Sequence, residues 1–316
     1  MARKRRGRPI DGILVLDKPT GLTSNASLQT AKRLFFAAKA GHTGNLDPLA
    51  TGVLPLCFGE ATKFSQYLLD SDKAYKSTFI LGVTTTSGDA DGDRLEHKPV
   101  DQIAEQHVAK ALETFRGEIE QIPSMFSALK HEGQPLYKLA RAGKEVERKA
   151  RQVTIYDIRL EAFRSCDQTN SSQLEVDVFV DCSKGTYIRS IAEDLGALLG
   201  CGAHVSALRR TKAGPFTIED AIKLPALEAL KQSESYEQMD ALLKPVDCAL
   251  TDMPVVNVGE SAEYYIRQGQ AVLIPKSPTT GMVRLLAEDQ RFLGIGSVLD
   301  DGRITPKRLI SSLSST

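Results

Sequence analysis

The sequence predicts an α+β protein with a mixed, largely antiparallel sheet in its main domain and a small β-rich domain at its C-terminal end. Strand-like and helix-like patterns are intermixed without strict alternation, which favours an antiparallel sheet over a doubly wound parallel one. Two stretches, Val153 to Phe163 and Leu174 to Cys182, alternate apolar and polar residues as half-buried strands do. Beyond residue 251, short apolar runs are separated by glycine, proline and aspartate, which is typical of a β-rich unit.

The N-terminal part of the chain predicts a strand, a helix and then an irregular loop. Ile13 to Leu16 is a short apolar run, and Ser24 is a candidate N-cap for the amphipathic helix that ends before Gly41. The segment from Gly41 to Pro48 is too rich in helix- and strand-breaking residues for regular structure. Further patterns predict a strand over 53–58, a helix over 61–69, a strand over 75–83 and a helix over 107–115.

The later elements include a strand with a predicted irregularity. In Val153 to Phe163 the phase of the alternation slips midway, which indicates a β-bulge. A helix over 187–199 and a strand over 204–210 follow the second alternating stretch. In the C-terminal unit, strands are expected over 255–258, 271–274, 282–287 and 292–298.

The segment 122–151 differs from its surroundings in charge. It carries seven basic residues against three acidic ones, contains glycine and proline, and shows little periodicity before Tyr137. We interpret it as an insertion or long loop with a basic face. From charge alone, a solvated helical hairpin is an equally good interpretation.

Composition excludes several classes of protein. The 316 residues include 41% hydrophobic and 25% charged residues, which is the ordinary range of a globular protein of about two domains. Forty basic residues balance forty acidic ones, so any affinity for nucleic acid must come from a local patch. No apolar run is long enough for a membrane span.

Two features of the sequence, its basic N-terminal tail and its cysteines, bear on the cellular compartment. Residues 1–9 form a basic tail, but the apolar stretch of a secretory signal does not follow it. The five cysteines are odd in number and widely spaced, which indicates reduced thiols in a cytoplasmic protein.

Most catalytic templates fail on this sequence. The loop at Gly41 lacks the continuation of a phosphate-binding P-loop. Asp89 to Asp93 begins like a calcium loop but lacks its later ligands, and we interpret it as a polar turn. The five histidines show no metal-ligand spacing, so no metal site is expected. No motif in the sequence indicates a nucleotide cofactor either.

Asp47 remains as a candidate catalytic residue. A loop aspartate is usually a turn former. Here, however, it lies in a glycine-rich loop, is followed by Pro48 and is flanked by leucines, a setting that suits a carboxylate fixed at the floor of a pocket. The hypothesis from the residues is a fixed nucleophile or base.

The block around this aspartate resembles the catalytic motif of the TruB-type tRNA pseudouridine synthases. That block, residues 41–54, reads GHTGNLDPLATGVL. Further blocks resemble other motifs of the family in the family's order between about residues 10 and 215: LDKPTGLTS at 16–24, DKAY at 72–75, IPSMFSALK at 122–130, CSKGTYIR at 182–189, and GAHV and LRR at 202–205 and 208–210. Asn45 departs from the small residue usual in the family, with little effect expected because asparagine tolerates turn conformations.

The resemblance implies a fold and a reaction. It implies a pseudouridine-synthase catalytic domain over 10–250, with 122–151 as a basic RNA-contacting insertion, and a PUA-like domain over 251–316. It further implies that uridine 55 in the T-loop of tRNA is isomerised to pseudouridine without a cofactor, after the base is flipped out of its stack. An accessory role in tRNA folding goes with this. The expected partner is tRNA, through its T-arm, with no membrane, no obligate protein partner and a monomeric enzyme.

The resemblance also carries site residues over to this chain. Asp47 would be the catalytic carboxylate, acting on the sugar, on the ring, or as a base. Tyr75 would hold the target uracil, and Arg189 would pair with Asp47. The remaining expectations are Tyr187 and Leu208 as pocket walls, His42 as a residue stacking in the T-loop, and Lys18 and Pro19 as supports of the catalytic loop. Contacts to the RNA backbone are expected from Lys130, Arg141, Arg148, Arg209 and Arg210, with no metal ligands.

Three other functions stay open at this point. The chain could be a non-catalytic RNA-binding or tRNA-folding protein that uses the same cleft. It could be a carboxylate-dependent nucleosidase that releases the base. It could also be a synthase acting on another RNA.

Overall fold

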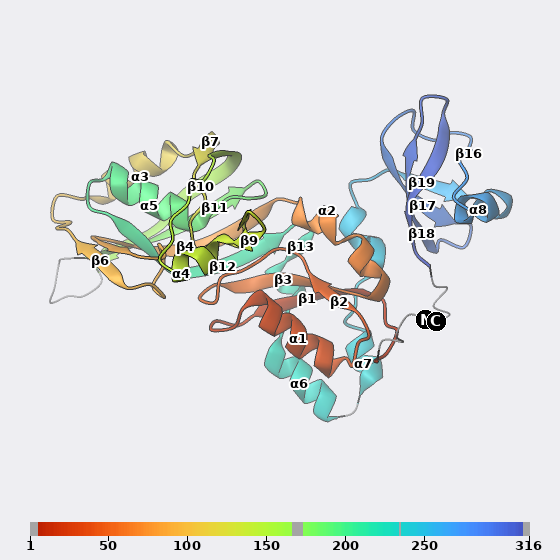
Figure 1. Cartoon of the computed structure of the whole chain (residues 1–316), viewed down its shortest axis with the longest axis horizontal. Helices are drawn as coiled ribbons and strands as arrows, with labels where there is room; N and C mark the ends of the chain where they lie inside the picture. Colours follow the sequence, from red (N-terminus) through yellow and green to blue (C-terminus); the bar gives the residue numbers. More distant parts are fainter. Residues whose placement is uncertain (1–5, 166–172, 234, 312–316) are drawn as a thin grey trace.

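A computed structural model describes residues 6–165, 173–233 and 235–311 of the chain, and these residues form two β-sheet domains (Figure 1). The larger domain is built on a ten-stranded sheet, and the smaller C-terminal domain on a five-stranded one. Residues 1–5 of the basic tail and Cys166 lie outside the described residues, whereas Cys57, Cys182, Cys201 and Cys248 are free thiols. In the described part of the chain, no helix is both long and apolar enough to cross a membrane.

The large sheet is mixed and largely antiparallel, which confirms the predicted fold class. Among the strands that the structure describes in this sheet, only the pairs β14–β1 and β12–β3 are parallel. In spatial order its strands are β14 (Ile222–Lys223), β1 (Gly12–Lys18), β3 (Thr51–Phe58), β12 (Ala203–Ala213), β4 (Lys73–Leu81), β11 (Leu174–Cys182), β10 (Arg151–Ser165) and β7 (Gly117–Gln121), with β2 (Ala40–His42) beside β3 and β13 (Phe216–Thr217) beside β12.

Helices cover this sheet in two groups. Helices α1 (Ser24–Leu34) and α6 (Leu224–Gln232) pack beside β1 and β3, and α3 (Glu105–Glu113) and α5 (Ile188–Leu198) pack on the half that contains β10 and β12 (Figure 1). The short elements of this domain are α2 (Ser65–Leu69), α4 (Leu136–Arg141), α7 (Tyr236–Asp240), the hairpins β5–β6 (Val83–Thr85, Arg94–His97) and β8–β9 (Lys130–His131, Gln134–Pro135), and the 3₁₀ turns Gly59–Lys63, Ile218–Asp220 and Val246–Leu250.

The C-terminal domain has its own apolar core. Strands β15 (Val255–Val258), β17 (Met282–Ala287), β18 (Phe292–Val298), β19 (Arg303–Leu309) and β16 (Val272–Leu273) form the sheet, and α8 (Glu260–Arg267) packs against it. A second, smaller cluster joins the two domains, because Phe64 and Leu250 pack against Ile295. The sequence predicted four of these strands but neither α8 nor β19.

Three local predictions need correction. Thr23, not Ser24, caps α1, since the Thr23 hydroxyl accepts a hydrogen bond from the Ala26 amide at 3.1 Å. The helix expected over 61–69 is a 3₁₀ turn followed by α2, and the break falls at Phe64, whose ring is buried against the C-terminal domain. The segment 122–151 is mostly loop, as one of its two interpretations expected, and its small hairpin and single short helix α4 contradict the alternative of a helical hairpin. The predicted irregularity in β10 is confirmed by two register shifts.

Strand β12 is central because it joins the two halves of the large sheet. Arg210 of β12 lies opposite Gly52 of the parallel strand β3 and opposite Tyr75 of the antiparallel strand β4. Gly52 has a φ of +100°, and a Cβ at this position would lie 2.1 Å from the Arg210 carbonyl oxygen. Only glycine therefore allows the chain that leaves the Asp47 loop to approach β12 so closely.

A substitution at this contact should destabilise the fold. For Gly52→Ala we expect the free energy of unfolding to fall by about 1–3 kcal/mol or more, because both the backbone strain and the clash must be relieved. Urea denaturation measures this. Gly41→Ala is a matched control, since its added Cβ would meet only the Thr62 methyl group, at 3.9 Å. Equal midpoints for the two variants would contradict the prediction.

Candidate active site

A cavity of about 360 Å³ opens at the junction of β4, β12 and the loop before β3. The structure brings six of the thirteen sequence-predicted site residues to its wall. Those that line it are Asp47, Tyr75, Tyr187, Arg189, Leu208 and Arg210. They come from segments more than 160 residues apart in the sequence, so the fold, rather than any local motif, creates the cavity.

Residues of β1 and α1 hold the loop that carries Asp47. The buried Lys18 ammonium donates to the carbonyl oxygens of Pro19, Pro48 and Ala50, at 2.9, 3.3 and 2.6 Å. Burial lowers the pKa of Lys18 to about 8. The Ser24 hydroxyl accepts from the Leu46 amide at 2.8 Å and donates to the Leu46 carbonyl oxygen at 3.2 Å. The backbone on both sides of Asp47 is thereby held in one conformation.

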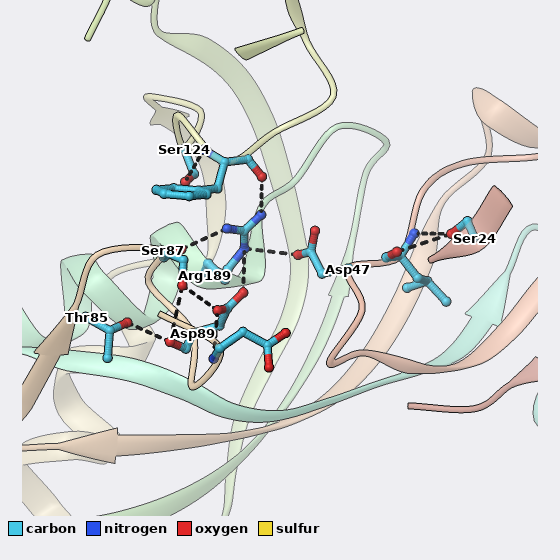
Figure 2. A network of polar contacts seen from close by, with 10 residues as sticks. Ser24, Asp47, Thr85, Ser87, Asp89, Ser124 and Arg189 are labelled. Carbon is cyan, nitrogen blue, oxygen red and sulfur yellow. Dashed lines mark hydrogen bonds and ion pairs between the residues drawn. The ribbon is translucent and has the colours of Figure 1, made fainter. Parts of the chain in front are cut away.

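Arg189 is the hub of the polar network around this loop (Figure 2). Its Nε lies 3.0 Å from Asp47 Oδ2 and 3.7 Å from Asp89 Oδ2. Its two terminal nitrogens donate to the carbonyl oxygens of Ser87, at 2.8 Å, and Phe126, at 3.0 Å. The Arg189 side chain is 4% exposed, and each of its three nitrogens has a protein partner. The guanidinium is therefore held in place and fixes the orientation of the Asp47 carboxylate.

Opposing effects act on the ionisation of Asp47. Burial, the largest effect, raises the pKa of Asp47 above its ordinary value, and the nearby Asp89 carboxylate acts in the same direction. The positive charges of Arg189 and then of Lys18 lower it. Arg189 is therefore the strongest influence in favour of the charged carboxylate, which suits a nucleophile or base rather than a surface charge.

Aromatic and apolar side chains form the rest of the wall. Tyr75 and Leu208 are each 9% exposed, and burial raises the pKa of the Tyr75 hydroxyl, which keeps the ring neutral. The Tyr187 backbone is clamped by Gln121, which accepts from the Tyr187 amide at 2.9 Å and donates to its carbonyl oxygen at 3.2 Å. A flat, uncharged ring could therefore enter beside Asp47 with apolar contacts on its faces.

Other expected residues lie elsewhere. His42 is half-buried beside the cavity, with its Nδ1 3.2 Å from the Gly44 carbonyl oxygen. Lys130 and Arg141 are exposed, as a backbone contact requires, whereas Arg148 is half-buried and donates to the Pro123 carbonyl oxygen at 3.3 Å. Arg209 is bound by Asp17 through both oxygens, at 3.0 and 2.9 Å.

The position of Arg210 differs from the one expected from the sequence. It was expected among the contacts to the RNA backbone, but it is 1% exposed. Successive side chains of a strand point to opposite faces, so Arg209 and Arg210 cannot both reach the same surface. Arg210 points into the sheet and reaches the inside of the cavity instead.

Sequence reasoning missed Asp89, Ser87 and Gln121. Asp89 is 5% exposed and belongs to the polar turn that begins like a calcium loop. The Ala90 amide donates to the Val205 carbonyl oxygen, which attaches this turn to β12 below Arg189. The cluster of acidic residues was the available signal, but nothing local indicated that the turn would meet an arginine a hundred residues later. In the described part of the chain, no group of three metal-binding side chains is assembled.

Solved structures share the fold of this chain. A chain in the crystal structure of a Cbf5-Nop10-Gar1 complex is 26% identical, with a TM-score of 0.69 over 94% of this chain and 84% of that one. The structure of an H/ACA RNP bound to a substrate RNA containing 2′-deoxyuridine has a similar fold, with a TM-score of 0.71 at 23% identity, over 99% and 92% of the two chains.

The chain belongs to the TruB family. Residues 32–188 match the TruB family pseudouridylate synthase N-terminal domain, 189–251 the tRNA pseudouridylate synthase B C-terminal domain, and 254–310 the C-terminal domain of pseudouridine synthase II TruB. A tRNA pseudouridine synthase B of Ectopseudomonas mendocina is 57% identical over 97% of both chains. One of Coxiella burnetii is 52% identical over 96% of both.

Proposed function

We propose that this protein isomerises uridine 55 in the T-loop of tRNA to pseudouridine. Two observations support this proposal. The chain belongs to the TruB family, and the relatives that it matches over 96–97% of both chains are named tRNA pseudouridine synthase B. The observation that carries the proposal is the ion pair between Asp47 and Arg189 at the wall of a cavity that also contains Tyr75. This pair supplies an oriented carboxylate next to a surface for a planar base.

In this reaction the sugar stays bonded to the same base, but the atom of the base that bonds to the sugar changes from N1 to C5. The N1–C1′ bond breaks, a C5–C1′ bond forms, the C5 proton leaves to solvent and N1 gains a proton, so no cofactor is consumed. Asp47 acts on the nucleotide as nucleophile or base, Arg189 orients its carboxylate, and Tyr75 packs against the uracil. Tyr187 and Leu208 close the walls, and Lys18 with Pro19 supports the loop. Because a base in a folded T-loop is stacked, it must be flipped into the cavity.

The test uses a synthetic T-arm hairpin with tritium at C5 of the target uridine. We expect tritium release by the wild-type protein, with no free uracil, because the base stays attached to the same sugar. Free uracil would instead identify a nucleosidase. A protein that binds the hairpin and a full tRNA transcript tightly but releases no tritium from either would be an RNA-binding protein, and the proposal would be wrong.

RNA binding is proposed to use a local basic surface, since the chain has no net charge. Exposed cations such as Lys130 and Arg141 belong to the same 122–151 segment as Ser127 to Leu129, which line the cavity. His42 lies next to the catalytic loop, at the place where a disturbed T-loop would stack. We propose a monomeric enzyme that acts on tRNA in the cytoplasm, where free thiols persist.

Binding to the T-arm should weaken steeply with salt. The logarithm of the association constant should fall linearly with that of the salt concentration, because phosphate contacts release counterions. Arg141→Gln should reduce this slope by about 1. Fluorescence anisotropy over a range of salt concentrations measures it. The exposed Lys110 on α3 is a control position, and an equal loss of slope in Lys110→Gln would show that the effect is one of net charge alone.

A further inference from the structure

Arg210 is a buried arginine with an unused hydrogen-bond donor. It is 1% exposed and is one of the largest fully buried side chains. Its Nε donates to the Val53 carbonyl oxygen at 2.7 Å. Its Nη2, although shielded from solvent, has no hydrogen-bond partner among the described residues. A buried charged donor without an acceptor costs free energy, so such a group calls for a functional explanation.

The charge of Arg210 is also uncompensated. Its neighbours in the site are paired, Arg189 with Asp47 and Arg209 with Asp17. No ion pair joins Arg210 to a carboxylate within the described residues. Burial, and then the positive charge of Arg210, lower the pKa of the adjacent Lys73 to about 8. Lys73 is itself a cation and donates to backbone carbonyl oxygens of α2, so it adds positive charge beside Arg210 and does not compensate it.

The guanidinium of Arg210 faces the cavity between the catalytic loop and the aromatic wall. A Cβ added to Gly44 would lie 3.6 Å from its Nη1. On the other side, Arg210 is the cross-strand neighbour of Tyr75, and its charge acts on the Tyr75 hydroxyl. Both Arg210 and Tyr75 line the cavity with Asp47. A base placed against Tyr75 would therefore present its edge to Arg210.

We propose that Arg210 is a further catalytic residue, which donates a hydrogen bond to an exocyclic oxygen of the target uracil. This assignment rests on the proposed function. When the N1–C1′ bond breaks, its electron pair stays with the ring and is delocalised over N1, O2 and O4. The ring then re-forms a bond to C1′ through C5, which loses its proton to solvent while N1 is protonated. A fixed guanidinium stabilises the charge on the oxygen during this exchange.

An RNA phosphate is the alternative acceptor for the same donor. It fits less well, because a phosphate carries its backbone on both sides and needs an open approach, whereas Arg210 is reached only from inside the cavity. The exposed cations of the 122–151 segment offer phosphate sites without this constraint. The burial of Arg210 therefore favours the base.

The test is a double-mutant cycle between the protein and the substrate. T-arm hairpins carry uridine, 2-thiouridine or 4-thiouridine at the target position, because sulfur accepts hydrogen bonds more weakly than oxygen. Conversion by wild type and by Arg210→Met is followed in single turnovers by digestion and chromatography. We expect Arg210→Met to slow the uridine hairpin by about 10²–10³-fold, with the hairpin Kd changed only a few-fold. Lys76→Gln, an exposed cation on β4 paired with Glu161, should react as wild type does.

The cycle distinguishes the possible acceptors. One of the two thio substitutions should lower the conversion rate of the wild type but lower that of Arg210→Met little further. The effects of the two changes would then not be additive, which would support the proposal. Additive effects for both would overturn it and leave Arg210 a structural residue. Coupling instead to methylphosphonate linkages beside the target would overturn it in favour of a phosphate contact.

Two further results can overturn the proposal. If Arg210→Met fails to fold, the same rates are measured with Arg210→Lys and with the wild-type protein. A wild-type protein that converts both thio hairpins as fast as the uridine hairpin would overturn the proposal. A wild type that converts no uridine hairpin overturns the proposed function, and this assignment with it.

Discussion

Asp47→Asn should reduce tritium release from the T-arm hairpin by about 10⁴-fold or more, because the amide can act neither as nucleophile nor as base. The substitution keeps the size and shape of the side chain. The loop around it is held by Lys18 and Ser24 through backbone atoms, and none of those contacts involves the Asp47 carboxylate. Folding and RNA affinity should therefore survive, so the loss should appear in the single-turnover rate rather than in Kd.

A second acid-to-amide change controls for the chemistry of the substitution. Glu161→Gln alters a carboxylate whose described contact is the surface lysine Lys76. It should convert the hairpin at the wild-type rate. If Asp47→Asn kept a tenth or more of wild-type activity, a different group would perform the reaction and the catalytic assignment would be wrong.

The sequence predicted the large elements of the fold well because their patterns are regular. The strict alternation of β11 needs only a period of two, and even the bulges of β10 appear as a slip of phase. Strand β19 was missed because it is highly charged and contains Pro306, a residue that disfavours sheets. In the fold, Pro306 lies beside a register shift, where the ladder is already interrupted.

The candidate site was predictable only in part. The motif around Asp47 indicated the loop, but the distance from Asp47 to Arg189 depends on the packing of α5 against β12, which no local pattern records. Asp89 entered the site through backbone bonds of its turn to β12. For Arg210, the general rule that arginines are exposed was misleading, although the alternation of faces along a strand could have separated it from Arg209.

Substitutions of Arg189 should show whether the reaction rate depends more on the ionisation of the Asp47 carboxylate or on its orientation. In Arg189→Gln, burial and the Asp89 carboxylate act on Asp47 without the larger of the two opposing cations, with Lys18 still in place, so the pKa of Asp47 should rise further. A smaller fraction of Asp47 is then ionised at neutral pH. We expect the rate at pH 7 to fall by about 10²–10³-fold, with the acidic limb of the pH–rate profile displaced to higher pH and partial recovery in alkaline buffer.

Arg189→Lys separates the two contributions. Its ammonium keeps the positive charge, so the acidic limb should stay close to that of the wild type. A single ammonium cannot, however, reproduce the planar set of donors that reaches Asp47, Ser87 and Phe126 together, so the plateau rate should still be low. Single-turnover rates across the pH range measure both quantities. An acidic limb that did not move in Arg189→Gln would mean that Arg189 positions Asp47 without controlling its ionisation, and a wild-type plateau in Arg189→Lys would mean the reverse.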